Sequence, residues 1–165
     1  AYRRQRQMCI RDRNIPEKLE GAYLFLEDVQ DPGNVGTIIR TADAAGYQGV
    51  FISSHSADIY NLKTLRSMQG SHFHLPIYRV SREDMLTLAR QNDLQILAST
   101  LSEDSLDYQK VEKNENFLLV MGNEGQGISQ EITDAADVLV HISMKGQAES
   151  LNVAVAAGIL MFALS

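Results

Sequence analysis

The sequence predicts an α/β protein built on a parallel β-sheet that is flanked by helices. Apolar runs of strand length alternate with segments whose apolar residues recur at helical spacing, and this alternation is typical of parallel sheets. Several of the runs end in small, polar loops that contain glycine. Ligands of open α/β sheets bind outside the carboxyl ends of the strands, so these loops are the first candidates for a functional site.

Strand-like and helix-like segments follow one another along most of the chain. Strands are expected at 22–27, 49–53, 95–99, 116–121 and 137–142, and an edge strand could lie near 74–79. Helices are expected at 35–45, 60–68, 82–91, 128–135 and 150–164. At 165 residues the chain is long enough for one domain that buries about two-thirds of its unfolded surface.

The segment after the first strand combines a turn with the start of a helix. Pro32 and Gly33 suit the second and third positions of a type II turn. Asn34 stands where an N-cap belongs, and Gly46 stands where a C-cap would end the helix. A strand, a tight turn and a helix N-terminus form a place for small anionic or carbonyl-bearing groups, although the same arrangement is common scaffolding.

Two later strands lead into loops of the same kind. The run 116–121 continues into Gly122-Asn123-Glu124-Gly125-Gln126-Gly127, where three glycines in six residues let the backbone approach a ligand closely. The run 137–142 continues through a polar loop to Ser150-Leu151-Asn152, near which the last helix is expected to begin. Ser150 and Asn152 could cap that helix or act in the site.

Composition excludes several classes of protein. The sequence has no apolar run of membrane-spanning length and no basic-then-apolar signal peptide. A single cysteine, Cys9, excludes an intramolecular disulfide framework, and no His and Cys residues have the spacing of zinc ligands. A soluble cytoplasmic protein without a metal is therefore expected.

Residues 1–13 differ in character from the rest of the chain. They hold five of the fifteen Lys and Arg residues, the cysteine, and no apolar periodicity. Residues 8–12, MCIRD, also look like the translation of an adapter used in preparing sequencing libraries. We interpret residues 1–13 as a foreign or disordered tail and 14–165 as the functional domain. A genuine basic arm for nucleic acid and a solvated tail are the alternatives.

The charge of the remaining domain is unfavourable for a polyanion ligand. Residues 14–165 carry ten Lys and Arg against twenty Asp and Glu. The distribution of charge matters more than its sum, and the stretch 59–82 has no acidic residue. Lys63 and Arg66 in this stretch are the candidate RNA-binding residues, although a chance fluctuation of composition would look the same.

Three ordered motifs give the chain a resemblance to a known family. They are Asn34-x-Gly36-x-x-x-Arg40-x-Ala42, then Gly122-Asn123-Glu124-Gly125-x-Gly127, and then Gly146-x-x-Glu149-Ser150-Leu151-Asn152-Val153-x-Val155-Ala156. Together they resemble the motifs of the SpoU-type (TrmH-like) RNA ribose 2′-O-methyltransferases of the SPOUT superfamily. The likeness extends from about residue 21 to the end. One departure is Ser143, where the family often has proline.

The resemblance implies an activity, a cofactor and an assembly. The expected reaction is transfer of a methyl group from S-adenosylmethionine to a ribose 2′-hydroxyl of ribosomal or transfer RNA. Family members are homodimers, carry a C-terminal trefoil knot, and commonly have an N-terminal RNA-binding domain. The last helix is apolar on more than one face, which agrees with a homodimer that uses it. Base rates alone would oppose a knot.

The resemblance also assigns residues to roles. The implied catalytic residues are Asn34, Arg40, Glu124, Ser150 and Asn152, and the implied cofactor-binding residues are Gly122, Asn123, Gly125, Gly127, Ile142, Met144, Ser150 and Leu151. Asn34 would hold the ribose or a phosphate, or cap its helix. Glu124 would bind Arg40, orient the substrate or take a proton.

The role of Arg40 follows from the chemistry of its side chain. Proposals for the family make this arginine the general base that deprotonates the 2′-hydroxyl. A guanidinium is effectively always protonated and then has no acceptor site. We therefore expect Arg40 to hold the flanking phosphate and the developing alkoxide, with the proton leaving late to phosphate, Glu124 or water.

Two other functions compete with this one. The first is a non-catalytic RNA-binding relative of the same fold. The motif residues retained in this sequence disfavour it. The second is a nucleotide-dependent enzyme of another kind on a doubly wound sheet. The loop at 122–127 does not fit G-x-G-x-x-G, and the sequence has no Walker-type Gly-Lys-Ser/Thr, so the second is disfavoured.

Overall fold

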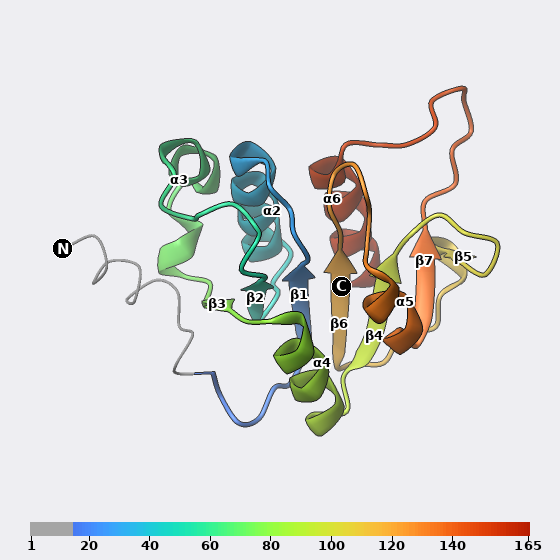
Figure 1. Ribbon diagram of the computed structural model, residues 1–165, viewed down its shortest axis with the longest axis horizontal. Coiled ribbons are helices and arrows are strands. Elements are labelled where there is room, and N and C mark those ends of the chain that lie inside the picture. Colours follow the sequence, from blue (N-terminus) through green and yellow to red (C-terminus); the bar gives the residue numbers. More distant parts are fainter. Residues whose placement is uncertain (1–14) are drawn as a thin grey trace.

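Within the part of the chain that the structure describes, a sheet of seven strands forms the centre (Figure 1). This computed structural model describes residues 15–165, so the expected tail at 1–13 lies outside the described residues. The strands are β1 (Ala22–Leu26), β2 (Gly49–Ile52), β3 (Ile77–Arg79), β4 (Gln95–Ser99), β5 (Leu106–Asp107), β6 (Phe117–Met121) and β7 (Val138–His141). Their order in the sheet is β3-β2-β1-β6-β4-β7-β5, and every pairing is parallel. The predicted parallel α/β architecture is confirmed.

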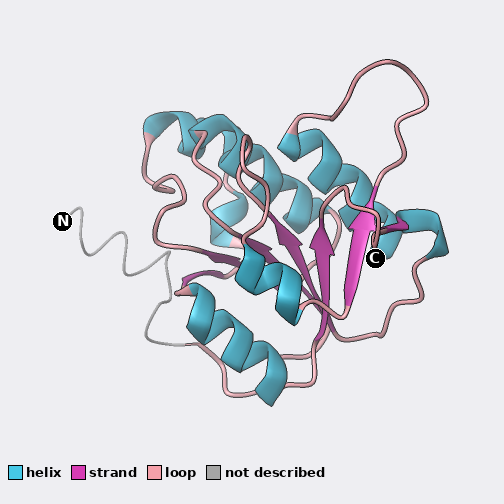
Figure 2. Ribbon diagram, turned by 45° about the vertical axis from the view of Figure 1, so that its right-hand side comes forward, coloured by secondary structure: helices cyan, strands magenta, loops and turns pink. Residues whose placement is uncertain are grey.

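Helices cover both faces of the sheet (Figure 2). They are α2 (Pro32–Ala44), α3 (Leu62–Met68), α4 (Arg82–Gln91), α5 (Gln130–Ala135) and α6 (Val153–Leu164), with short 3₁₀ turns η1 (Ser71–Phe73) and η2 (Tyr108–Lys110). Buried side chains of α2 and α6 pack with Leu24 and Leu26 of β1. Buried side chains of α4 and α5 pack with Tyr23 and Phe25 on the opposite face. Alternate residues of one central strand thus anchor two separate apolar layers.

The predicted strands and helices are confirmed, with differences at their ends. The edge strand expected near 74–79 is β3, and the last helix begins at Val153 rather than near Ser150. Strand β5 was not predicted, because two residues are too few to show a period. The trefoil knot that the resemblance implies stays a prediction.

The start of α2 corrects the expected turn. Asp31, not Asn34, is the N-cap: its side chain accepts a hydrogen bond from the backbone N–H of Asn34 across 3.0 Å. Pro32 occupies the first helical turn, where its missing N–H and fixed φ are favourable. Asn34 therefore lies within the helix. The predicted end is confirmed, since Gly46 has a φ of +79° directly after the C-cap Ala45.

A motif glycine lets two helices touch. A Cβ added to Gly36 of α2 would lie 2.5 Å from the carbonyl oxygen of Thr64 and 2.5 Å from Ser67 Cβ of α3. No side chain fits at that separation, so Gly36 holds α3 directly against α2. This contact places Lys63 beside the N-terminus of α2, where its Cε would lie 3.2 Å from a Cβ added to Gly33.

Candidate active site

Three segments that carry the sequence motifs meet at the carboxyl ends of β1, β6 and β7. Glu124 Oε2 accepts a hydrogen bond from Asn34 Nδ2 across 3.4 Å. Asn34 Oδ1 accepts in turn from Asn152 Nδ2 across 3.2 Å. One residue from each motif therefore joins a continuous chain of side chains. The structure brings together three of the predicted catalytic residues that lie up to 118 positions apart.

Glu124 is held by the backbone that leads into α2. Its Oε1 accepts from the N–H of Gln30 across 3.0 Å, and its Oε2 accepts from the N–H of Asp31 across 2.7 Å. Burial by itself would raise the pKa of Glu124, but the hydrogen bonds from Gln30, Asp31 and Asn34 outweigh it and lower that pKa. Glu124 is accordingly a carboxylate at neutral pH, and both of its oxygens already accept.

Asn152 both caps a helix and reaches the site. Its Oδ1 accepts from the N–H groups of Ala154 and Val155 at 2.8 and 3.2 Å, which makes it the N-cap of α6. Its amide nitrogen is then left to donate to Asn34. The two roles weighed for this residue are compatible, because each uses a different end of the amide.

The glycine loop is closed on itself. Asn123 Oδ1 accepts from the N–H groups of Gly125 and Gln126, both at 2.9 Å, and Asn123 and Gly127 exchange backbone hydrogen bonds. A Cβ added to Gly122 would lie 2.4 Å from the carbonyl carbon of Gly127. The expected close approach is thus made by the loop's own backbone at Gly122, whereas a Cβ on Gly125 would meet Asn123 Oδ1 at an ordinary 3.6 Å.

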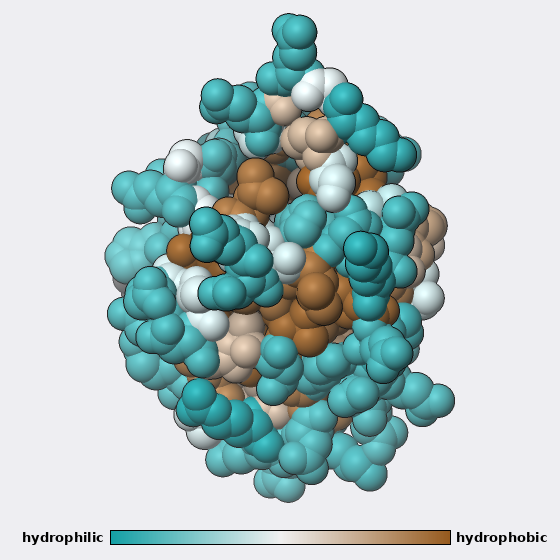
Figure 3. All heavy atoms as spheres, turned by 90° about the vertical axis from the view of Figure 1, so that its right-hand side faces the viewer, coloured by the Kyte–Doolittle hydropathy of each residue, from teal (hydrophilic) through white to brown (hydrophobic). Residues whose placement is uncertain are grey.

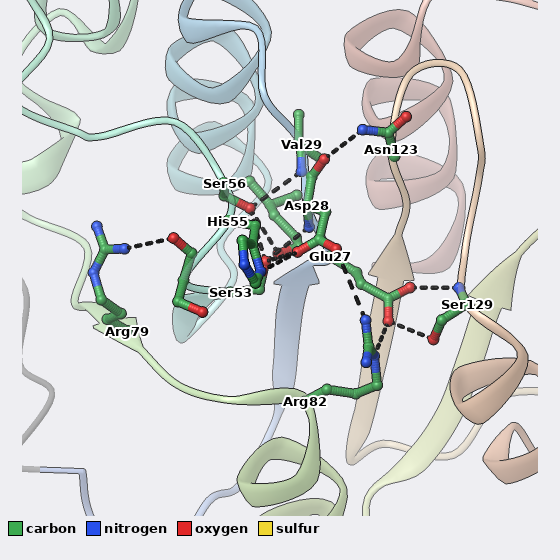
Figure 4. Close-up of polar contacts among 12 residues, drawn as sticks. Glu27, Asp28, Val29, Ser53, His55, Ser56, Arg79, Arg82, Asn123 and Ser129 are labelled. Carbon is green, nitrogen blue, oxygen red and sulfur yellow. Dashed lines mark hydrogen bonds and ion pairs between the residues drawn. The ribbon is translucent and has the colours of Figure 1, made fainter.

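A buried carboxylate that sequence reasoning missed ties this loop to β1 (Figure 4). Glu27 is 2% exposed and follows β1 directly. Its oxygens accept from the backbone N–H and the hydroxyl of Ser129 at 2.7 and 2.6 Å, and from Nε of Arg82. Asn123 Nδ2 also donates to the carbonyl oxygen of Asp28 across 2.8 Å. The sequence feature that could have predicted this cluster is an acidic residue placed directly after an apolar run.

A cavity of about 150 Å³ lies between the ends of β4 and β7. It is lined by Ser99, Thr100, Leu101, His141, Ile142, Met144, Glu149, Ser150, Leu151 and Ala156. Apolar surface gathers on this side of the molecule, beneath a projecting hydrophilic loop (Figure 3). Four of the predicted cofactor residues, at positions 142, 144, 150 and 151, are on the wall, while the glycine loop is not. The segment 99–101 and His141 carry no motif and were missed.

A sequence profile of the SpoU rRNA Methylase family matches residues 21–162. The chain belongs to this family. It is 43% identical over 150 residues to the Bacillus subtilis protein "23S rRNA (guanosine(2553)-2'-O)-methyltransferase RlmP", an alignment that covers 90% of this chain and 60% of that protein. The chain thus spans little more than half the length of the curated relatives it matches.

Solved structures of SpoU-family proteins have the same fold. An AdoMet-bound rRNA methyltransferase from Sinorhizobium meliloti is 40% identical with a TM-score of 0.84, covering 90% of this chain and 57% of that one. The SpoU methyltransferase AviRb from Streptomyces viridochromogenes, in complex with AdoMet, is 33% identical with a TM-score of 0.79, covering 93% and 61%. The predicted family resemblance is confirmed.

Arg40, the arginine of the first SpoU motif, stands apart from the other catalytic candidates. It lies six residues beyond Asn34 on α2, about 9 Å along the helix axis. Arg40 is exposed, and its guanidinium makes no hydrogen bond or ion pair with any residue between 15 and 165. The expected option that Glu124 binds Arg40 is therefore not realised within one chain.

The acid-free stretch of this SpoU-family chain is only partly available to a ligand. Arg82 is bound to Glu27, and His74 Nδ1 lies 3.1 Å from Asp43 Oδ2. Lys63 and Arg66 on α3 are both exposed. Within the described residues, no helix is long and apolar enough to cross a membrane, and no group of His, Cys, Asp or Glu could hold a metal ion.

Proposed function

We propose that the chain is the methyl-transfer domain of an RNA ribose 2′-O-methyltransferase that acts on ribosomal or transfer RNA. The observation that carries this proposal is the hydrogen-bonded chain Glu124–Asn34–Asn152, which unites the three SpoU motifs beside a cavity. Two relatives support it: one is named as a 23S rRNA 2′-O-methyltransferase, and the other is an AdoMet-bound rRNA methyltransferase.

The cavity fits part of S-adenosylmethionine. Leu101, Ile142, Met144 and Leu151 offer an apolar wall for a flat base, and Ser150 and Glu149 offer polar atoms beside it. These residues would hold the cofactor, whose sulfonium methyl is electrophilic without further activation. The protein must then align the 2′-hydroxyl with that methyl and accommodate the proton.

Asn34 is the side chain best placed to orient the ribose. Glu124 can only accept and Asn152 Nδ2 can only donate, so together they fix which end of the Asn34 amide is nitrogen. The second N–H of Asn34 and the second N–H of Asn152 remain for substrate. Glu124 acts as the holder of this amide, because a carboxylate with a lowered pKa and two occupied oxygens is a weak proton acceptor.

Arg40 completes the site as an electrostatic clamp. An exposed guanidinium with no partner in residues 15–165 is available for a phosphate and for the developing alkoxide. Lys63, which lies against the start of α2, and Arg66 are proposed to contact further phosphates. Such contacts would position RNA without reading its sequence.

We further propose that the domain is a cytoplasmic homodimer. Val155, Ile159 and Phe162 of α6 are exposed at 51%, 36% and 54%. Their spacing of four and three residues places them on one face of the helix, where a second copy would bury them. Helix α6 packs against α2, so this interface would lie next to the helix that carries Arg40.

Transfer of a tritiated methyl group to RNA tests the proposed function. The purified chain should bind S-adenosylmethionine by calorimetry and label ribosomal RNA from cells that lack the corresponding activity. Binding of RNA without cofactor binding or labelling would instead indicate a non-catalytic relative. Stabilisation by NAD or ATP, but not by S-adenosylmethionine, would contradict the proposal altogether.

A further inference from the structure

A relay of hydrogen-bonded side chains lies beside the cavity, and the proposed methyl transfer does not use it. His141 is the last residue of β7 and lines the cavity. Its Nδ1 lies 2.7 Å from Ser105 Oγ, and its Nε2 lies 3.3 Å from Ser143 Oγ. Ser143 Oγ donates in turn to Asp107 Oδ2 across 2.6 Å.

One end of the relay supports the wall formed by Leu101. Ser105 Oγ accepts from the N–H of Ser102 across 3.1 Å and donates to its carbonyl oxygen across 2.7 Å. These bonds close a tight turn that directly follows Leu101. The Ser105 N–H also donates to the Ser102 carbonyl oxygen across 3.2 Å, so Ser105 closes the turn with both its backbone and its hydroxyl.

The other end supports the opposite wall. Ser143 precedes Met144, which lines the cavity, and Asp107 belongs to the edge strand β5. Strand β5 pairs with β7 so that Asp107 is opposite His141. The relay thus links the edge strand, the turn after Leu101 and the loop after β7 through one imidazole ring.

The available protons determine the direction of each bond. A carboxylate can only accept, so the single hydroxyl proton of Ser143 belongs to its bond with Asp107. Ser143 Oγ must then accept from His141, which assigns a proton to Nε2. The hydrogen bonds from Ser143 and from the Gln109 N–H lower the pKa of Asp107, which keeps this acceptor ionised.

Nδ1 of His141 is left as the acceptor of the ring. With the ring proton on Nε2, the Ser105 hydroxyl donates to Nδ1 across 2.7 Å. The Ser102 carbonyl oxygen still accepts from the Ser105 N–H across 3.2 Å, and Ser105 Oγ still accepts from the Ser102 N–H across 3.1 Å. The ring protonated on Nε2 therefore satisfies every partner of the relay at once.

We propose that His141 is a positioning residue of the cofactor cavity and that its ring, bonded at both nitrogens, holds the two walls in the binding geometry. This proposal rests on the proposed function. A proline at position 143, common in the family, has no hydroxyl and could not form this relay.

Calorimetric titration of the full chain with S-adenosylhomocysteine tests the proposal. Variants His141→Gln and Ser143→Ala each break the relay, and each should raise the Kd about tenfold, the equivalent of one lost hydrogen bond. Ser143→Thr keeps the hydroxyl and should keep the wild-type Kd.

His74→Gln is the matched control, because His74 is an exposed histidine paired with Asp43 and does not line the cavity. It should retain the wild-type Kd. An unchanged Kd in His141→Gln or in Ser143→Ala overturns the relay and leaves the proposed function standing. Failure of the wild type to bind overturns both.

The tautomer of His141 supplies a readout that does not involve the cofactor. Long-range ¹⁵N–¹H spectra of the imidazole should show a proton on Nε2. A ring without a proton on Nε2 would contradict the assignment and overturn the relay. Circular dichroism of each variant distinguishes these effects from loss of folding.

Discussion

Asn152 donates a hydrogen bond from its side-chain Nδ2 to Asn34, while its side-chain Oδ1 caps the N-terminus of α6. The first and third SpoU motifs are therefore joined by one residue that also fixes the start of the last helix. Because the two functions use different atoms, they can be separated by substitution.

Asn152→Asp keeps an acceptor for the cap but removes the donor to Asn34. We expect the free energy of unfolding to change little while methyl transfer falls strongly. Asn152→Ala removes both, and loss of an N-cap costs about 1 kcal/mol of stability in addition. Urea unfolding and single-turnover methylation of the pair distinguish the two effects, and equal stability losses in both variants would contradict the separation.

Glu27 should be the largest single polar contributor to stability among the described residues. In Glu27→Ala, Arg82 and Ser129 lose the acceptor of their part-buried hydrogen bonds while Arg82 keeps its ion pairs with Asp28 and Glu131, and the loss costs about 1–3 kcal/mol. Urea denaturation measures this loss. Lys18→Ala removes an exposed ion pair with Glu20 and should leave the midpoint unchanged. A similar midpoint for both variants would show that the Glu27 cluster is not a structural anchor.

The glycine loop offers a probe of ligand contact. A side chain on Gly125 meets only ordinary contacts, so Gly125→Val should fold normally, and we predict that it abolishes cofactor binding by blocking the backbone. Gly122→Ala should instead unfold or distort the loop, because its Cβ would overlap the backbone of Gly127. If a folded Gly125→Val protein binds the cofactor with unchanged affinity, this loop does not form part of the cofactor site.

The sequence predicted the sheet and the location of the site but not the contacts within it. Apolar periods and ordered motifs placed the strands, the helices and the three loops. The pairing of Glu27 with Arg82, 55 residues away, has no local signal, because tertiary neighbours leave no period. A turn at Asp31-Pro32 predicts Asn34 as the N-cap, but the same pair also starts helices, and here Asp31 is the cap.

Substitutions of Arg40 distinguish an electrostatic clamp from a general base. Arg40→Ala should lower single-turnover methyl transfer by about 100- to 1000-fold with cofactor affinity nearly unchanged. Arg40→Lys keeps the charge but loses the planar fork, so its loss should be smaller. A clamp predicts a pH profile for Arg40→Lys that has the wild-type shape at a lower level. Methyl-transfer activity that rises as the lysine amine deprotonates would instead indicate that residue 40 acts as the general base.

The most direct test of the proposed site is the chemical position of the transferred methyl group. RNA treated with the protein and S-adenosylmethionine is digested to nucleosides and analysed by mass spectrometry, with the wild type beside Asn34→Ala. The wild type should yield a 2′-O-methylated nucleoside, and Asn34→Ala should lose it while still binding S-adenosylhomocysteine. A methyl group on a base, or undiminished 2′-O-methylation by Asn34→Ala, would contradict a ribose-directed site organised by Glu124, Asn34 and Asn152.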